Sequence, residues 1–190
     1  MKKLLILTLV ILMPEVLLAK SRTKSEPKAL LTLDQVELPK DMEVCFSPDE
    51  PCDLKLIKLV NSAEKSLDIA IYDINIDQLV HSVLVKSKSI PVRIVVDQRQ
   101  SKGSHSLVET LIKAGASVRY GRQRGIMHNK FVIVDGKTVE TGSFNFTNHA
   151  SQANNENQIY ITSPAVVERY VNRFETIWDK ASDAKKSETK

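Results

Sequence analysis

Apolar positions along the first two thirds of the chain recur with two different periods, which divide it into expected strands and helices. Short runs rich in β-branched residues predict strands over residues 43–46, 66–72 and 92–97. Apolar residues spaced three and four apart predict helices over residues 51–65, 77–88 and 104–115. Strands that alternate with helices of this length indicate an α/β fold with parallel strand pairs.

The pattern changes after Gly115, where strands follow one another without long helices between them. Strands are expected over residues 117–120, 127–134, 137–143 and 157–162. The pair Asp135-Gly136 is a strong signal for a two-residue hairpin turn. Pro164, with Ser163 as its cap, begins a last amphipathic helix. We therefore expect one α/β domain, built as a mixed β-sheet flanked by helices on both faces.

The first residues have the pattern of a secretory signal. Two lysines precede Leu4–Met13, in which nine of ten residues are apolar, and Ala19 stands before a polar stretch. The run is shorter than the ~20 residues of a membrane span, although an uncleaved N-terminal anchor stays open. We expect a signal peptide over residues 1–19, a linker over 20–42, the catalytic domain over 43–181 and a polar tail over 182–190. The expected location is periplasmic or secreted.

Composition narrows the class of protein without identifying it. Hydrophobic residues make up 42% and charged residues 26% of the 190 positions, which excludes a disordered chain and a multi-pass membrane protein. The net charge of +4 permits an anionic partner without requiring one. Cys45 and Cys52 are too few for a four-cysteine zinc site. In an oxidising compartment they could form a disulfide, and two reduced thiols are the other reading.

Polar side chains gather on the expected hairpin. If Asp135-Gly136 is a simple turn, Lys130 lies opposite Thr141 and His128 opposite Ser143. Side chains alternate along a strand, so these four residues and Asn145 would share one face. Asp135 lies seven residues from His128, about 23 Å at strand rise, which indicates a structural role.

Such a patch suits phosphoryl transfer. A neutral histidine can attack phosphorus, while lysine and amide donors stabilise the charge on the phosphate oxygens. No cluster of Asp and Glu accompanies these residues, which favours a route without metal and without a cofactor. Glu156 could hold the second nitrogen of the histidine and fix its tautomer. The plain alternative is a surface hairpin with incidental polar residues.

The run His128-x-Lys130-x4-Asp135-x6-Gly142-Ser143-x-Asn145 resembles the signature of the phospholipase D superfamily, and most closely its small bacterial single-motif endonucleases of Nuc type. The resemblance implies an α/β/α sandwich in which His128 forms a phosphohistidine and Lys130 and Asn145 bind phosphate oxygens. It further implies that Ser143 supports the site, that Glu156 orients the histidine, and that Asp135 is counted with the active site. Two motif histidines are needed and this chain has one, so a homodimer with the active site at its interface is expected.

Arginines near the motif bear on the substrate. Arg122 and Arg124 precede His128 closely and, with Thr141, are candidates for substrate contact; His149 is a weaker one. Basic side chains around a phosphodiester site suit the backbone of nucleic acid, read without sequence preference. We expect an endonuclease acting on DNA, with RNA as a further substrate. A phospholipase D or cardiolipin hydrolase acting on membrane lipid is the main alternative, and a non-catalytic binding protein is a third.

Overall fold

The structure is a computed structural model that describes residues 39–121 and 125–184. Its strands are β1 (Met42–Ser47), β2 (Leu67–Ile71), β3 (Val92–Asp97), β4 (Ser117–Gly121), β5 (Lys130–Val134), β6 (Thr138–Gly142), β7 (Glu156–Ile161) and β8 (Ser182–Asp183). Its helices are α1 (Cys52–Asn61), α2 (Asp77–Lys86), α3 (Val108–Lys113), α4 (Asn148–Gln152) and α5 (Pro164–Lys180), with a short 3-10 turn, η2 (Gln100–Lys102).

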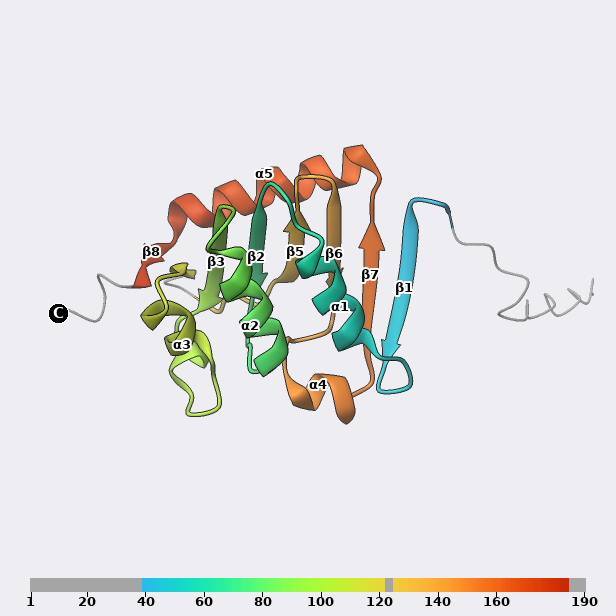
Figure 1. Ribbon diagram of the computed structural model, residues 1–190. Coiled ribbons are helices and arrows are strands. Elements are labelled where there is room, and N and C mark those ends of the chain that lie inside the picture. The colour runs from blue at the N-terminus through green and yellow to red at the C-terminus, as the bar shows by residue number, and fades with distance from the viewer. Residues whose placement is uncertain (1–38, 122–124, 185–190) are drawn as a thin grey trace, which may run out of the picture. The chain divides into compact units, whose positions relative to one another are not determined.

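The eight described strands form one mixed sheet in the order β1-β7-β6-β5-β2-β3-β4-β8. The pairs β2–β3 and β3–β4 are parallel, and every other pair is antiparallel. Helices α1, α2 and α3 lie in front of the sheet in Figure 1, and α5 packs behind it against β4, β5 and β6. The expected mixed sheet with helices on both faces is confirmed.

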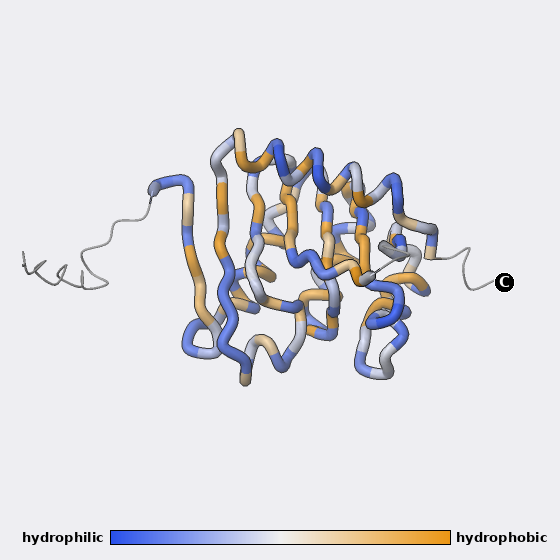
Figure 2. The backbone as a smooth tube through the Cα atoms, turned by 180° about the vertical axis from the view of Figure 1, so that it is seen from behind, coloured by the Kyte–Doolittle hydropathy of each residue, from blue (hydrophilic) through white to orange (hydrophobic). Residues whose placement is uncertain are grey.

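Two hydrophobic clusters hold these layers together. The larger lies between the sheet and α1–α3, and the smaller joins the other face to α5 through Phe131, Val139 and Phe174. All five residues of β2, and all five of β5, are buried, because both strands are covered on both sides. Figure 2 shows hydrophobic positions along the strands and alternating positions along α5, as expected for an amphipathic helix that packs by one face.

The hairpin between β5 and β6 differs from the prediction by one residue. Asp135 and Gly136 form the turn with φ of 56° and 62°, and the Lys137 N–H donates to the Val134 carbonyl at 2.9 Å. However, Val134 pairs with Thr138, so Lys137 is left outside the pairing as a bulge. The predicted register, with Lys130 opposite Thr141, is therefore wrong. Phe131 lies opposite Thr141 instead.

Several expected elements are shorter than their patterns suggested. The expected strand 127–134 begins only at Lys130, and the expected helix 104–115 begins only at Val108. In both places, backbone groups bind elsewhere: the Met127 N–H binds a carboxylate, and the Leu107 N–H binds the Ile74 carbonyl at 3.0 Å. Helix α4, with Thr147 as its cap, and strand β8 were not predicted.

The described domain begins slightly earlier and ends slightly later than expected, since β1 starts at Met42 and β8 ends at Asp183. The expected signal peptide, residues 20–38 of the expected linker and residues 185–190 of the expected tail lie outside the described residues. Within residues 39–121 and 125–184, no helix has the length and apolar character to cross a membrane.

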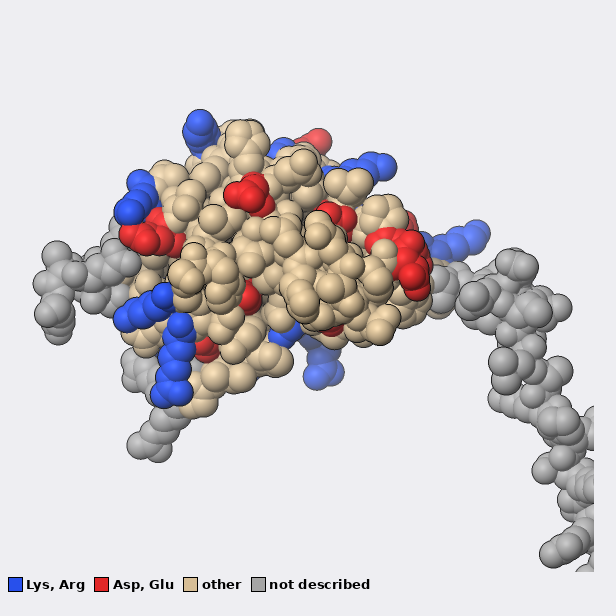
Figure 3. All heavy atoms as spheres, turned by 90° about the horizontal axis from the view of Figure 1, so that it is seen from below, with Lys and Arg blue, Asp and Glu red and all other residues tan. Residues whose placement is uncertain are grey.

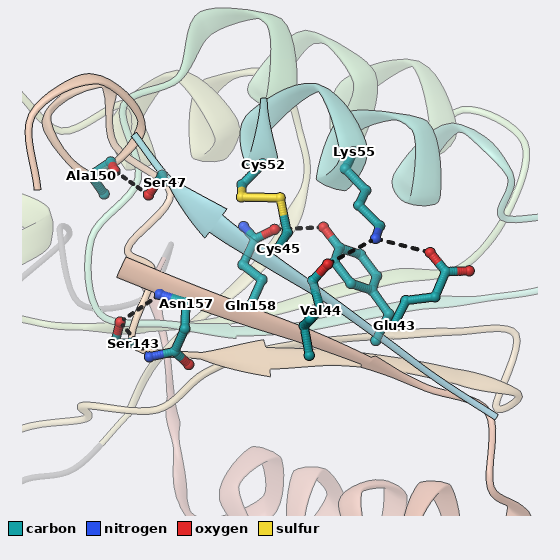
Figure 4. The surroundings of a disulfide bond; sticks show 11 residues. Glu43, Val44, Cys45, Ser47, Cys52, Lys55, Ser143, Ala150, Asn157 and Gln158 are labelled. Atoms are coloured by element: carbon teal, nitrogen blue, oxygen red, sulfur yellow. Dashed lines mark hydrogen bonds and ion pairs between the residues drawn. A yellow bond between two sulfur atoms is a disulfide. The ribbon is translucent and has the colours of Figure 1, made fainter. Parts of the chain in front are cut away.

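The two cysteines are joined by a disulfide between β1 and the first turn of α1 (Figure 4). Both cysteines are buried. On the same strand, the Ser47 hydroxyl donates to the Ala150 carbonyl at 2.8 Å, which connects β1 to α4. Strand β1 is thus attached to α1 by the disulfide and to α4 by a hydrogen bond.

Candidate active site

The polar residues of the motif, apart from Asp135, lie at one edge of the sheet, the lower edge in Figure 1. The carboxyl ends of β2, β3, β4 and β6 lie there, together with the amino ends of β5 and β7. Ligands of open α/β sheets bind outside the carboxyl ends of parallel strands. Figure 3 looks onto this edge and shows a broad uncharged area, with an acidic cluster toward the β1 end and basic side chains toward the β8 end.

His128 lies on the short extended segment that leads into β5. The segment is fixed by Met127, whose side chain is buried and whose N–H donates to the Asp97 carboxylate at 2.9 Å. The imidazole itself is exposed, and its ring lies edge-on to Tyr72 with 4.7 Å between centroids. A fixed backbone and an aromatic contact thus hold a histidine that solvent can reach.

Lys130 is the first residue of β5 and is 8% exposed. Its ammonium lies 3.3 Å from His128 Nε2, and it donates to the His128 carbonyl at 3.2 Å. Burial lowers the pKa of this ammonium, and the nearby Glu156 carboxylate partly opposes that effect. The pair therefore presents a nucleophilic nitrogen and a cation side by side, which suits attack on a phosphate.

Gly142 and Ser143, at the end of β6, lie against the start of β7. A Cβ on Gly142 would lie 2.0 Å from the Asn157 carbonyl oxygen, so only glycine fits. This close approach lets the Ser143 hydroxyl donate to the Glu156 carboxylate while it accepts from the Asn157 N–H at 3.1 Å. Asn154 donates to the other Glu156 oxygen at 2.9 Å.

Asn145 lies between Phe144 and Phe146, both of which are fully buried in the larger core cluster. The Phe146 N–H binds the Asp73 carbonyl at 3.1 Å, which attaches this segment to the residues that follow β2. Asn145 Oδ1 is buried without a hydrogen-bond partner among the described residues. The side-chain oxygen of Asn145 therefore forms no hydrogen bond with the described part of the protein.

Asp135 lies at the opposite end of β5 from Lys130 and is therefore outside the candidate site. Its carboxylate accepts the backbone N–H groups of Glu64, Lys65 and Ser66 at 2.7 to 3.1 Å. Burial raises its pKa, but these bonds and the Lys137 charge outweigh that effect and lower it. Asp135 fixes the loop before β2, in agreement with the structural role inferred from its spacing.

Thr141 and Glu156 also differ from the roles expected of them. Thr141 shares a face with Phe131, not with Lys130, and its hydroxyl donates to the Lys130 carbonyl at 2.9 Å, so it does not join the candidate site. Glu156 binds Ser143 and Asn154, and no hydrogen bond joins it to His128 within the described part of this chain. Arg122 and Arg124 lie outside the described residues.

Sequence reasoning missed Tyr72 and Asp97, two residues that contact the segment carrying His128. Both lie where a parallel strand ends: Tyr72 directly follows β2, and Asp97 closes β3. A polar residue at the carboxyl end of each expected parallel strand was the available signal. His105, which falls within the expected helix 104–115, instead lies before α3 with its Nε2 3.1 Å from Asp73.

Comparison with known proteins agrees with this geometry. Residues 56–178 match the family model described as "Cardiolipin synthase, PLD-like domain". A mitochondrial cardiolipin hydrolase of Xenopus tropicalis is 34% identical over 131 residues, which are 68% of this chain and 62% of that protein. A phospholipase D of Rickettsia conorii is 33% identical over 70% of this chain and 67% of its own length.

Solved structures give the same result. Nuc from Salmonella typhimurium, a phospholipase D family member, superimposes with a TM-score of 0.69 at 29% identity, over 75% of this chain and 96% of its own. NucT from Helicobacter pylori, at 23% identity and a TM-score of 0.68, shows the same fold over 75% of this chain and 98% of its own. This chain therefore belongs to the phospholipase D superfamily.

Proposed function

We propose that the protein is an endonuclease that hydrolyses DNA without a metal ion, with RNA as a further substrate. The observation that carries the proposal is the open position of His128 and Lys130 on a sheet edge, where an exposed imidazole lies 3.3 Å from a buried ammonium. An exposed edge admits any stretch of a long polymer. The match that covers 96% of Nuc, and the resemblance of the motif to Nuc-type endonucleases, support it.

In the proposed reaction, His128 Nε2 attacks phosphorus and forms a P–N bond while one ester oxygen leaves. Lys130 and the Asn145 amide stabilise the charge on the non-bridging oxygens. The leaving oxygen needs a proton, which a second motif histidine supplies, and water then hydrolyses the phosphohistidine. The other histidines of this chain, His81, His105 and His149, are not followed by lysine two residues later. The proposal therefore includes a homodimer that brings two copies of the site together.

Hydrolysis of membrane phospholipids is the second candidate. It is supported by the names of the relatives, since a cardiolipin hydrolase is 34% and a phospholipase D 33% identical to this chain. However, the chain spans only 62% of the Xenopus tropicalis protein, so that protein's substrate does not transfer by itself. Both substrates contain a phosphodiester, and the same residues would act on either.

We also propose that the protein is exported to the periplasm or secreted. The basic start and the apolar run of residues 4–13 support this, and a disulfide between Cys45 and Cys52 is typical of an oxidising compartment. Fractionation of cells that express the full chain tests it: the protein should be found outside the cytoplasm and should migrate as a chain shortened by about 19 residues, as a cleaved leader predicts.

The test of function uses the purified protein with plasmid and single-stranded DNA in EDTA, beside His128→Asn and the control His81→Asn. His81 is exposed on α2, so its loss should leave activity unchanged. Cleavage by the wild type and the control, but not by His128→Asn, supports the proposal. Cleavage that requires added metal contradicts it. Release of phosphatidic acid from cardiolipin vesicles, with no cleavage of DNA, favours the lipid alternative.

A further inference from the structure

A groove of about 420 Å³ lies beside the motif, between residues 126–129 and the second half of α5. One wall contains Ile126, Met127 and Asn129, which flank His128 in sequence. None of the motif residues discussed above lines it, apart from Met127. The groove therefore adjoins the nucleophile and extends behind it, along the face that α5 covers.

The helical wall has a regular pattern. Arg173, Thr176, Ile177 and Lys180 occur at spacings of three, four and seven residues, so they form one stripe along α5. Its two cations are separated by seven residues, about 10.5 Å along the helix axis. The stripe is thus cationic at both ends and apolar or hydroxylic between them.

These two cations are exposed, and no ion pair joins either of them to a residue of the described ranges. Glu175, the nearest acid in sequence to Arg173, is bound to Arg93 at 2.7 Å. That bond directs it away from the stripe. Two positive charges therefore face a groove next to a phosphodiesterase site without a partner of opposite sign.

We propose that this groove holds the strand that flanks the scissile phosphate, with Arg173 and Lys180 bound to phosphates one and two units away. This inference rests on the proposed function and adds the path of the substrate. A nucleic acid strand presents one phosphate in every repeat, and two separated cations match such a repeated charge. Ile126, which is 48% exposed, and Ile177 offer apolar contact to the sugar and base between the phosphates.

The experiment compares Arg173→Glu/Lys180→Glu with the control Lys65→Glu/Lys88→Glu. The control changes the net charge equally, at exposed positions in loops near the opposite edge of the sheet. Each protein is assayed with a 20-nucleotide single-stranded DNA and with bis(p-nitrophenyl) phosphate, a diester too small to span the groove. Melting temperatures show whether each variant folds, and Arg173→Gln/Lys180→Gln provides a milder pair.

We expect the KM of the groove variant for the oligonucleotide to rise at least tenfold, with the small diester hydrolysed at the wild-type rate. In the glutamine pair, the slope of log KM against log salt should fall by about 1.4, as the loss of two phosphate contacts on a single strand predicts. The control should behave as the wild type with both substrates.

Equal KM values for the groove variant and the control, while the wild type cuts the oligonucleotide, would overturn the inference and leave the proposed function standing. An equal loss with the small diester would also overturn it, because the substitution would then act on catalysis. If the wild type hydrolyses the small diester but not the oligonucleotide, the proposed function itself fails. A rise in KM for cardiolipin vesicles alone would assign the groove to lipid instead.

Discussion

The Asp97 carboxylate accepts the backbone N–H of Met127 at 2.9 Å, and this one bond connects the end of β3 to the segment that carries His128. The other carboxylate oxygen accepts the N–H groups of Arg99 and Gln100, each at 3.0 Å. Asp97 is therefore fixed by the loop that follows it and in turn fixes the backbone next to the nucleophile. It touches no reacting atom, which makes it a positioning residue.

Replacement of Asp97 by alanine should lower kcat toward a small diester by about 10- to 100-fold, or ~1.4 to 2.7 kcal/mol of activation free energy. The reason is that the Met127 N–H loses its acceptor and the imidazole loses its fixed position. KM should change little, and Asp97→Asn should recover part of kcat because one oxygen acceptor remains. The control is Asp77→Ala on the surface of α2. A parallel fall in kcat for control and variant would contradict this role.

Tyr72 should contribute through its ring and not through its hydroxyl. The ring lies edge-on to His128, and the Lys130 ammonium lies 5.4 Å from its centroid. Tyr72→Phe keeps both contacts and should retain kcat within about threefold, whereas Tyr72→Ala should lower it by about tenfold. Steady-state kinetics with a small diester measures both. Equal losses in the two variants would assign the effect to the hydroxyl.

The sequence predicted the layers of the fold more accurately than the alignment of the hairpin strands. The turn at Asp135-Gly136 formed as its residue types require, because both positions have positive φ. The bulge at Lys137 could not be read from the sequence, since a one-residue shift changes every opposite pair but leaves the turn signal intact. For that reason, the predicted register placed Thr141 opposite Lys130, whereas its side chain lies on the face of the sheet that carries Phe131.

Longer-range bonds were harder still to predict. Asp97 and Met127 are thirty residues apart, and only the assembled sheet brings the end of β3 to the motif segment. Asp135 is different: its distance from His128 along a strand was enough to assign it a structural role. Spacing within one element was therefore informative, and contacts between elements became visible only with the fold.

Replacement of Asp135 should lower stability and leave catalysis intact. Its carboxylate holds three N–H groups before β2, and hydrogen bonds to a charged acceptor contribute about 1.5–3 kcal/mol, more than bonds to a neutral one. Asp135→Asn is the suitable change because asparagine also tolerates the positive φ of 56°. We expect a lower melting temperature at pH 7, with kcat toward a small diester unchanged within twofold.

The stabilising effect of Asp135 should depend on pH in a definite direction. The folded state lowers the pKa of Asp135, so its stabilising effect is present above the unfolded pKa and is lost as pH falls through the folded pKa. The difference in melting temperature between wild type and Asp135→Asn should therefore shrink between pH 5 and pH 3. A kcat that falls together with stability at pH 7 would place Asp135 in the catalytic machinery after all.

Glu140 provides a pH effect of the opposite sign. It lies on β6 beside Tyr160 of β7, fully buried, and neither carboxyl oxygen has a hydrogen-bond partner among the described residues. Burial raises the pKa of this carboxyl well above its usual value. The folded chain thus keeps a proton that the unfolded chain releases, so stability falls as pH rises above the unfolded pKa, by up to ~1.4 kcal/mol per pH unit.

Glu140→Gln removes this titration and nearly preserves the shape of the side chain. The variant should therefore gain melting temperature relative to the wild type as the pH is raised from 5 to 8, with the gain growing steadily over that interval. Thermal unfolding across the range measures it, with the exposed Glu168→Gln on α5 as the control that should show no such trend. A constant difference between Glu140→Gln and the wild type at every pH would show that Glu140 is not held in its neutral form, and the buried carboxyl would then need a partner that the described residues do not provide.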